Sequence, residues 1–251
     1  MNAQFDLTGK VALVTGAGTG LGAAMATGLA GAGSDLVLTD ITAPEETARK
    51  AKALGRRVGV FAADLSDMEA LKAAAAGAIA EFGKIDILVN NAGIIRRTPA
   101  IDHSEADWDD VMALNAKTVF FLSQAIARDM MKRKKGKIIS VASLLSFQGG
   151  VTVPSYAASK GAVVQITRAL ANEWAKEGIN VNAIAPGYMV TNNTEKLRND
   201  PERFRAISER IPAARWGMPE DLQGAVVFLA SAASDYIHGH VLVVDGGWMA
   251  R

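Results

Sequence analysis

Short apolar runs rich in β-branched residues recur along the chain, separated by longer segments that have the composition of helices. Such runs are typical of parallel strands that are buried on both faces. We expect strands at residues 10–14, 36–39, 58–62, 85–89, 137–141, 179–185 and 241–244. We expect helices at residues 20–32, 44–54, 67–82, 104–114, 118–133, 154–177 and 219–231, with Ser66 as the N-cap of the third. Strands that alternate with helices in this way predict an α/β fold, a single doubly wound parallel sheet with helices on both faces.

One polar segment interrupts this alternation. Residues 188–212 carry many charged side chains and show little strand character. We interpret the segment as a lid over a binding site, with an inert surface loop as the alternative. No linker or change in composition divides the chain, so we predict one domain over residues 1–251.

Composition and charge argue against several classes of function. The chain is 49% hydrophobic and 21% charged, which is ordinary for a globular protein, and its net charge of +1 attracts neither nucleic acid nor an anionic membrane. It has no cysteine, and its three histidines lack the spacing of metal ligands, so we expect no metal. The first residues do not resemble a signal peptide, and the uncharged stretch at 11–34 is too rich in glycine for a membrane span. We therefore expect a cytoplasmic location.

Glycines cluster between the first predicted strand and the first predicted helix, in Thr15-Gly16-Ala17-Gly18-Thr19-Gly20-Leu21-Gly22. In this context glycines permit a tight turn and let backbone amides approach a pyrophosphate at the helix N-terminus, although a glycine-rich turn that binds nothing is the alternative. Asp40 follows, at the end of the second predicted strand. A carboxylate there accepts hydrogen bonds from a ribose 2′-hydroxyl and repels a 2′-phosphate. No Lys or Arg stands in the next eight residues, so we predict a dinucleotide site that prefers NAD to NADP.

Tyr156 and Lys160 lie four residues apart in a predicted helix that begins at Pro154, so they share one face. A free tyrosine has a pKa near ~10, and an ammonium group nearby lowers it. We expect Lys160 to lower the pKa of Tyr156, which makes the pair a candidate acid/base device. An isolated pair of this kind is more often a tyrosine packed beneath a solvated lysine, so the rest of the chain must decide.

With the glycine loop, Asn90-Asn91-Ala92-Gly93, Ser143 and Tyr156-x-x-x-Lys160 in this order, the chain resembles the short-chain dehydrogenase/reductase family from about Leu7 to its C-terminus. The resemblance implies an oxidoreductase that acts on CH–OH donors, built on one NAD(P)-binding Rossmann domain. It implies these catalytic residues: Asn115, Ser143, Tyr156 and Lys160. It implies these cofactor-binding residues: Gly16, Thr19, Gly20, Leu21, Gly22, Asp40, Asp64, Leu65, Asn91, Ala92, Gly93, Tyr156, Lys160, Pro186, Gly187 and Thr191.

The family pattern also implies a role for each catalytic residue. Tyr156 is the acid/base, and Ser143 hydrogen-bonds the reacting carbonyl or hydroxyl group. Lys160 binds the nicotinamide ribose, and Asn115 holds a kink in its helix and a water of a proton relay. The resemblance further implies a homotetramer, with the C-terminal residues 248–251 at a subunit boundary.

Two segments indicate the kind of substrate. Arg96 and Arg97 follow the fourth predicted strand, and paired guanidinium groups suit a carboxylate, although two solvated surface arginines are the alternative. Ser146 and Gln148 carry groups that can hydrogen-bond sugar hydroxyls or simply build a turn. The predicted substrate-binding residues are Arg96, Arg97, Ser143, Ser146, Gln148, Tyr156 and Tyr188.

These segments, with residues 172–176, 185–193 and 245–251, resemble the family's dehydrogenases of deoxy sugar acids. The resemblance implies NAD-dependent oxidation of a small anionic acid such as 2-dehydro-3-deoxy-D-gluconate or 2-deoxy-D-gluconate, in the catabolism of pectin- or alginate-derived uronates. Reduction of 4-deoxy-L-erythro-5-hexoseulose uronate, or oxidation of another sugar or polyol, is the alternative. A non-catalytic dinucleotide sensor belongs to a different class and predicts a broken set of Ser143, Tyr156 and Lys160, whereas the set is whole here.

Overall fold

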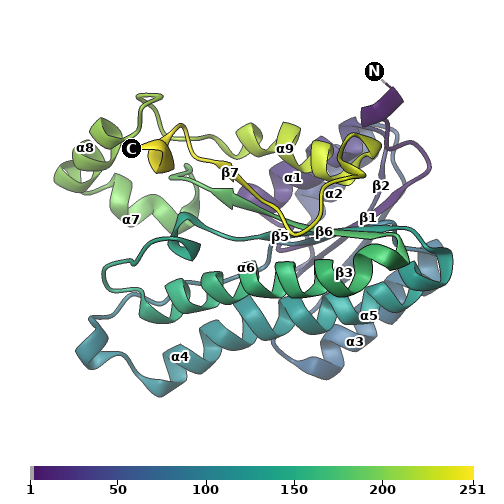
Figure 1. Ribbon diagram of the computed structural model, residues 1–251, viewed down its shortest axis with the longest axis horizontal. Coiled ribbons are helices and arrows are strands. Elements are labelled where there is room, and N and C mark those ends of the chain that lie inside the picture. The colour runs from purple at the N-terminus through teal and green to yellow at the C-terminus, as the bar shows by residue number, and fades with distance from the viewer. Residues whose placement is uncertain (1–2) are drawn as a thin grey trace.

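The computed structural model describes residues 3–251, and within them a single sheet holds seven parallel strands in the order β3-β2-β1-β4-β5-β6-β7 (Figure 1). The strands are β1 (Val11–Thr15), β2 (Asp35–Asp40), β3 (Val58–Ala62), β4 (Ile87–Asn90), β5 (Gly136–Val141), β6 (Ile179–Pro186) and β7 (Val241–Val244). The chain builds outward from β1 to β3 and then returns to place β4 on the other side of β1. Ligands of doubly wound sheets bind beyond the carboxyl ends of the strands at such a reversal, so the topology places a site between β1 and β4.

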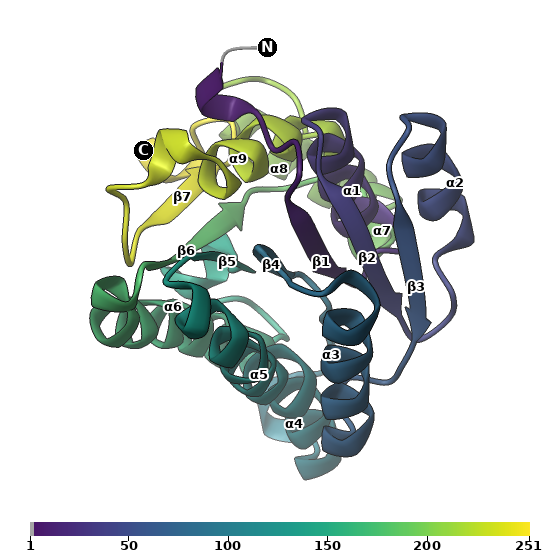
Figure 2. The ribbon, with the colours of Figure 1, turned by 90° about the vertical axis from the view of Figure 1, so that its right-hand side faces the viewer.

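Helices cover both faces of the sheet (Figure 2). One face carries α1 (Gly20–Gly31), α2 (Glu45–Ala53) and α9 (Gln223–Ala230), and the other carries α3 (Met68–Phe82), α4 (Glu105–Met112), α5 (Thr118–Arg133) and α6 (Pro154–Trp174). Two further helices, α7 (Glu195–Arg198) and α8 (Pro201–Arg210), lie beside the C-terminus at one end of the molecule (Figure 1). Short 3₁₀ helices occupy Ala3–Phe5, Ala100–Asp102, Leu144–Ser146, Ala175–Glu177, Asn192–Thr194, Pro219–Leu222, Ala232–Ser234 and Trp248–Ala250.

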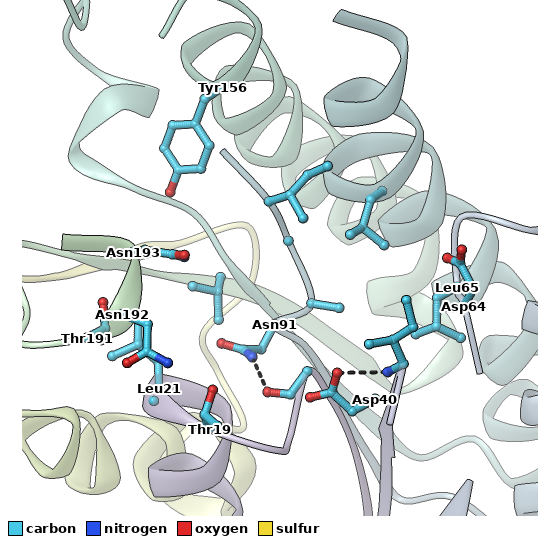
Figure 3. A pocket seen from close by; sticks show the side chains of 18 of the residues that line it. Thr19, Leu21, Asp40, Asp64, Leu65, Asn91, Tyr156, Thr191, Asn192 and Asn193 are labelled. Atoms are coloured by element: carbon cyan, nitrogen blue, oxygen red, sulfur yellow. Dashed lines mark hydrogen bonds between the residues drawn. The ribbon is translucent and has the colours of Figure 1, made fainter. Parts of the chain in front are cut away.

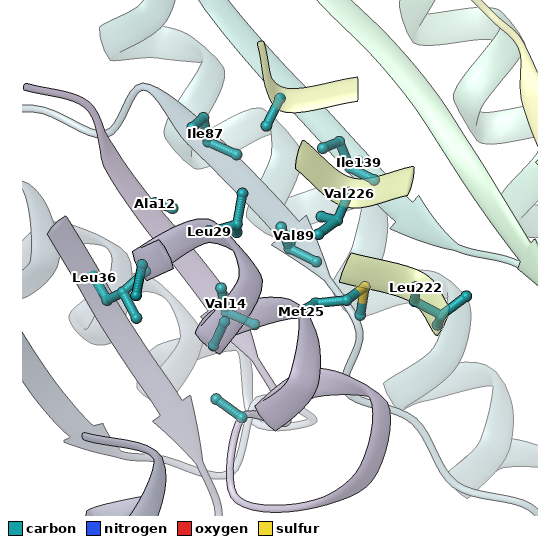
Figure 4. Packing of buried hydrophobic residues seen from close by; sticks show 14 of the residues in the cluster. Ala12, Val14, Met25, Leu29, Leu36, Ile87, Val89, Ile139, Leu222 and Val226 are labelled. Atoms are coloured by element: carbon teal, nitrogen blue, oxygen red, sulfur yellow. The ribbon is translucent and has the colours of Figure 1, made fainter. Parts of the chain in front are cut away.

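Each face of the sheet has its own apolar core. Met25 and Leu29 of α1 and Val226 of α9 pack on strand residues such as Val14 and Val89 (Figure 4). The opposite core joins α3, α5 and α6 to the other side of the same strands. Every residue of β1, β4, β5 and β6 is buried, which explains why apolar residues in these strands are not confined to alternate positions. No helix in residues 3–251 has the length and apolar character that crossing a membrane requires.

The two helices predicted on either side of Asn115 are joined without a break. A π-helical segment, Ala113–Lys117, connects α4 to α5, and Asn115 lies in it, completely buried. π-helical turns are rare and occur frequently at functional sites. The helix irregularity implied at Asn115 is therefore present.

The predicted N-cap of α3 is wrong by one residue. The carboxylate of Asp67 accepts hydrogen bonds from the backbone amides of Glu69 at 2.7 Å and Ala70 at 3.0 Å, which makes Asp67 the N-cap. The hydroxyl of Ser66 instead donates to the Asp64 carboxylate at 2.7 Å. Both residue types are good N-caps, so the local sequence does not choose between adjacent candidates.

The polar segment at 188–212 contains more regular structure than its sequence suggested. It forms α7 and α8, and Asp200 caps α8 by accepting hydrogen bonds from the amides of Glu202 and Arg203, both at 3.1 Å. Ile207 of α8 packs in a small apolar cluster with Trp216 and Trp248. The segment therefore has an apolar cluster of its own.

Candidate active site

A cleft of about 340 Å³ opens at the carboxyl ends of the central strands. Figure 3 shows Asp40, Asp64 and Leu65 together at one end of it, with Thr191, Asn192 and Asn193 at the other. Most predicted cofactor residues line this cleft: Gly16, Thr19, Gly20, Leu21, Asp40, Asp64, Leu65, Asn91, Ala92, Gly93, Tyr156, Lys160 and Thr191. The prediction missed Ile41, Ala63, Ile94, Leu114, Val141, Asn192 and Asn193, most of which directly adjoin predicted positions.

The glycine loop keeps its shape through close backbone packing. Gly16 has a left-handed backbone with φ of +62°, and a Cβ atom built on Gly22 would overlap the carbonyl oxygen of Gly16. The Asn91 side-chain amide donates to the carbonyl oxygens of Thr15 at 2.9 Å and Gly16 at 3.0 Å. Gly22 does not line the cleft; it lets α1 begin directly against the loop. The N-terminus of α1 thus faces the cleft, where its amides and dipole suit a pyrophosphate.

Asp40 lies on the rim of this cleft. Its carboxylate accepts hydrogen bonds from the amide of Gly18 at 2.8 Å and from that of Ile41 at 2.7 Å, the second of which is drawn in Figure 3. A Cβ atom on Gly18 would lie 2.9 Å from the same carboxylate. Within the described chain, Lys160 is the one cationic residue among those that line the cleft. The end at Asp40 and Asp64 is therefore acidic, and no arginine or lysine of the described lining lies at that end.

Tyr156 extends from the first turn of α6 into the cleft (Figure 3). Burial raises its pKa, and a hydrogen bond with Ser143 and the positive charge of Arg97 oppose that rise. Burial lowers the pKa of Lys160 to about 8. The lysine ammonium donates to the carbonyl oxygen of Val141 at 2.6 Å and lies 5.7 Å from the centre of the tyrosine ring. The predicted lowering of the tyrosine pKa by Lys160 is wrong for this structure, because burial dominates and the ammonium faces a backbone carbonyl.

Asn115 links the loop after β4 to α6. Its side chain both accepts from the amide of Ile94 and donates to the carbonyl oxygen of Ile94, each at 2.9 Å, and it also donates to the hydroxyl of Ser159 at 3.1 Å. Ser159 lies between Tyr156 and Lys160 on α6 and is fully buried. Asn115 therefore fixes the distance between the cleft wall and the helix that carries the Tyr156 and Lys160 pair.

A second cavity, of about 270 Å³, lies on the other side of Tyr156. Tyr156 and Asn193 line both spaces. Of the predicted substrate residues, Arg97, Ser143, Gln148, Tyr156 and Tyr188 line this cavity, and Pro186 and Gly187 line it instead of the cleft to which they were assigned. The prediction missed Arg203 and Arg210 of α8 and the C-terminal Trp248. The structure therefore places Tyr156 at the junction of the two spaces.

Two predicted substrate residues are used elsewhere. The guanidinium group of Arg96 pairs with Asp107 at 3.3 Å and Asp110 at 3.2 Å on α4, and Arg96 does not line the cavity. The Ser146 hydroxyl donates to the Lys160 carbonyl oxygen at 2.7 Å and accepts from the Ser143 amide at 3.2 Å. Ser146 therefore builds the turn that presents Ser143, which is the alternative considered for it.

The C-terminal residues contribute to this cavity rather than extending from the molecule. Trp248 is 5% exposed, and its ring lies 4.7 Å from that of Tyr188 and donates through Nε1 to Gln148 at 3.3 Å. Gln148 also contacts the sulfur of Met249 at 2.8 Å. The sequence marked this tail as apolar, but only the fold shows that it reaches the loop before α6.

The fold, the glycine loop against α1 and the set of Ser143, Tyr156 and Lys160 define a class of dinucleotide-dependent oxidoreductase. A family model described as enoyl-(acyl carrier protein) reductase matches residues 16–249. The chain belongs to the short-chain dehydrogenase/reductase family, and it is an oxidoreductase that acts on CH–OH donors.

Individual relatives share almost its full length. It is 62% identical to a 2-dehydro-3-deoxy-D-gluconate 5-dehydrogenase from Dickeya dadantii and 59% identical to one from Escherichia coli, over 98% of each chain. A candidate 2-deoxy-D-gluconate 3-dehydrogenase from Agrobacterium tumefaciens, solved with NADP, is 52% identical, has a TM-score of 0.93 and covers 100% of both chains. A gluconate 5-dehydrogenase from Burkholderia cenocepacia, solved with NADP and tartrate, is 41% identical with a TM-score of 0.94 over 99% of this chain and 98% of that one.

Proposed function

We propose that this enzyme oxidises a secondary hydroxyl group of a deoxy sugar acid, with 2-dehydro-3-deoxy-D-gluconate as the substrate and C5 as the reacting carbon. The observation that carries this proposal is the cavity beside Tyr156, which has arginines and no aspartate or glutamate in its described lining. Such a cavity favours an anionic ligand. The named activity of the 62% and 59% identical relatives supports the particular acid and the carbon.

The reaction requires a base for the hydroxyl proton and an acceptor for the hydride. A bound nicotinamide supplies the acceptor. Tyr156 receives the proton at its phenolic oxygen, and Ser143 hydrogen-bonds the substrate oxygen as charge develops on it. Lys160 lies one turn after Tyr156 on α6 and lines the cleft, where ribose hydroxyls are suitable partners for its ammonium group.

The pH dependence follows from the pKa of Tyr156. Burial raises that pKa, and oxidation needs the deprotonated phenol. We therefore expect kcat/KM for oxidation to rise towards alkaline pH, and kcat/KM for the reverse reduction, which needs the protonated phenol, to fall. A pH profile of both directions measures this. A tyrosine that titrates near neutrality would give profiles already flat at pH 8.

We propose NAD as the preferred cofactor. The support is the Asp40 carboxylate on the cleft rim and the lack of a cation near it in the described lining. Related structures hold NADP, so the preference needs a direct test. Steady-state kinetics with both cofactors should give a higher kcat/KM for NAD. Asp40→Ala should lower the ratio of kcat/KM with NAD to kcat/KM with NADP by roughly tenfold or more, since it removes the repulsion of a 2′-phosphate.

Asp64→Asn is the matched control for Asp40→Ala. Asp64 lines the same end of the cleft, but the glycine loop donates its Gly18 amide to Asp40 and not to Asp64. We expect Asp64→Asn to change the ratio little. A wild-type enzyme that works better with NADP would show the assignment of NAD to be wrong.

The substrate is tested by measuring NADH formation or consumption on a panel. The panel contains 2-dehydro-3-deoxy-D-gluconate, 2-deoxy-D-gluconate, D-gluconate, 4-deoxy-L-erythro-5-hexoseulose uronate and neutral sugars. We expect the highest kcat/KM for 2-dehydro-3-deoxy-D-gluconate and very low activity on neutral sugars. Equal activity on acids and neutral sugars would contradict an anion-selective cavity, and no turnover of any compound would favour a dinucleotide sensor.

A further inference from the structure

Three arginines from two segments of the chain line the cavity beside Tyr156. Arg97 comes from the loop after β4, and Arg203 and Arg210 come from α8. None of the other described lining residues is an aspartate or a glutamate. Three cations that face one space without a carboxylate repel one another, so the space is completed best by an anionic ligand.

The arrangement of α8 separates these arginines from its other charges. Arg203 and Arg210 are seven residues apart, which places them on one face of the helix. Arg205 does not line the cavity, and it pairs with Glu209 at 3.8 Å. Within residues 3–251 neither Arg203 nor Arg210 has an ion pair, whereas Arg96 is neutralised by two aspartates of α4. The charges of Arg203 and Arg210 are therefore available to a ligand.

Arg210 is also held in place. Its guanidinium carbon lies 4.0 Å from the centre of the Trp248 ring, a cation–π distance, and the indole N–H donates to Gln148. Arg97, from the loop after β4, donates to the carbonyl oxygen of Asn193 at 3.3 Å. A guanidinium group stacked in this way keeps its N–H edges free for a carboxylate. The indole thus orients Arg210 without using its hydrogen-bonding capacity.

We propose that Arg203 and Arg210 of α8, together with Arg97, form the subsite that binds the carboxylate of the substrate. The inference rests on the proposed function, which makes the substrate a hydroxy acid. It assigns carboxylate recognition to the predicted lid segment instead of to Arg96. Because two of the three cations are on α8, binding of the carboxylate is coupled to the position of that helix over the cavity.

The test compares Arg203→Gln, Arg210→Gln and the double variant with Arg205→Gln. Arg205→Gln is the matched control, because it removes the same charge from the same helix on its outer face. Charge-assisted hydrogen bonds of this kind correspond to roughly tenfold to hundredfold in binding. We expect KM for the sugar acid to rise by about that factor in the double variant, with NAD affinity and kcat changed less than about twofold. Arg205→Gln should match the wild type.

Two further measurements make the result specific. Binding of tartrate, a small hydroxy diacid, to the NAD complex is measured by calorimetry and should weaken in parallel with KM. The neutral methyl ester of the substrate should bind equally to the wild type and to the double variant, because it carries no carboxylate. If the double variant bound the acid and the ester more weakly by the same factor, the proposal would be overturned. Such a result would show that the substitutions changed the shape of the cavity and did not remove recognition of a charge.

The outcomes separate this inference from the proposed function. If the wild type oxidises the sugar acid and the double variant keeps its KM and tartrate affinity, the subsite is wrong and the function stands. If the wild type oxidises none of the acids, the function is wrong. The tartrate measurement then decides the subsite by itself. Weaker tartrate binding in the Arg203 and Arg210 variants but not in Arg205→Gln supports the subsite, and an unchanged affinity contradicts it.

Discussion

The dinucleotide cleft and the substrate cavity meet at Tyr156 but are built in different ways. The cleft lies at strand ends, is shaped by glycines and backbone groups, and has aspartates at one end with Lys160 as its cation in the described lining. The cavity draws on residues from Ile95 to Trp248, has three arginines and lacks acidic side chains in its described lining. The cleft is thus shaped mainly by backbone geometry, as suits a ligand common to a large family, whereas the cavity is shaped by side chains on loops and α8, as suits recognition of one particular substrate.

The largest expected effect tests whether the junction of the two spaces is the reaction centre. Tyr156→Phe removes the phenolic oxygen, and we expect turnover to fall by about 10³-fold or more while NAD binding is retained. Turnover is measured spectrophotometrically, and binding by fluorescence titration. Tyr236→Phe is the control, because Tyr236 is 99% exposed and lines neither space. Near-normal turnover in Tyr156→Phe would contradict the assignment of Tyr156 as the acid/base residue.

The cleft's buried cation should destabilise the protein when no dinucleotide is bound. Lys160 is 4% exposed, and burial lowers its pKa to about 8. Between pH 8 and about 10.5 the unfolded state binds more protons than the folded state, so wild-type stability rises with pH across that window. The lowered pKa corresponds to at most about 3 kcal/mol of destabilisation at neutral pH.

Denaturant unfolding of Lys160→Met and wild type at several pH values measures this effect. Below pH 8, Lys160→Met should have a higher free energy of unfolding than the wild type. The gain should be smaller than about 3 kcal/mol, because the variant loses the hydrogen bond to Val141. The difference between the two proteins should shrink as the pH rises to 10.5. The exposed Lys52 provides a control, and Lys52→Met should show no such trend. A constant difference between Lys160→Met and wild type at all pH values would contradict the buried charge.

A glycine substitution tests the claim that backbone packing builds the cleft. A Cβ atom on Gly22 would overlap the Gly16 carbonyl oxygen, so Gly22→Ala should cost about 1–3 kcal/mol in the free energy of unfolding and weaken NAD binding. Gly31→Ala in the same helix meets no atom within 4 Å and should be neutral or slightly stabilising. Chemical denaturation and NAD titration measure both effects. Equal behaviour of the two variants would refute the packing argument.

The smallest expected effect concerns the acidic end of the cleft, at Asp40 and Asp64. Asp67 caps α3 two residues after Leu65, which lines the cleft together with Asp64. Asp67→Ala should therefore lower the free energy of unfolding by about 1 kcal/mol and leave tartrate binding unchanged. Ser66→Ala should have less effect, since Ser66 does not cap the helix. The reverse ranking of the two variants would restore Ser66 as the cap.

The sequence predicted the cleft better than the cavity. Thirteen of the sixteen predicted cofactor residues line the cleft. They belong to short motifs at the ends of strands, so their positions in space follow once the strands are known. Arg96 and Arg97 are adjacent and looked equivalent, yet neighbouring side chains in a loop point in different directions, and one of them meets α4. Arg203 and Arg210 were overlooked because the segment at 188–212 carries its charges on short helices that no strong apolar pattern marked.

The sequence by itself determined the parallel sheet, the dinucleotide loop and the pairing of Tyr156 with Lys160, because apolar periodicity, glycine conformation and helical spacing act over a few residues. Only the tertiary structure decided the direction of the tyrosine pKa, the loss of Arg96 to α4 and the meeting of Arg97, Arg210 and Trp248 in one cavity. Burial and charge contacts between distant segments are properties of the packed molecule, and no local pattern encodes them.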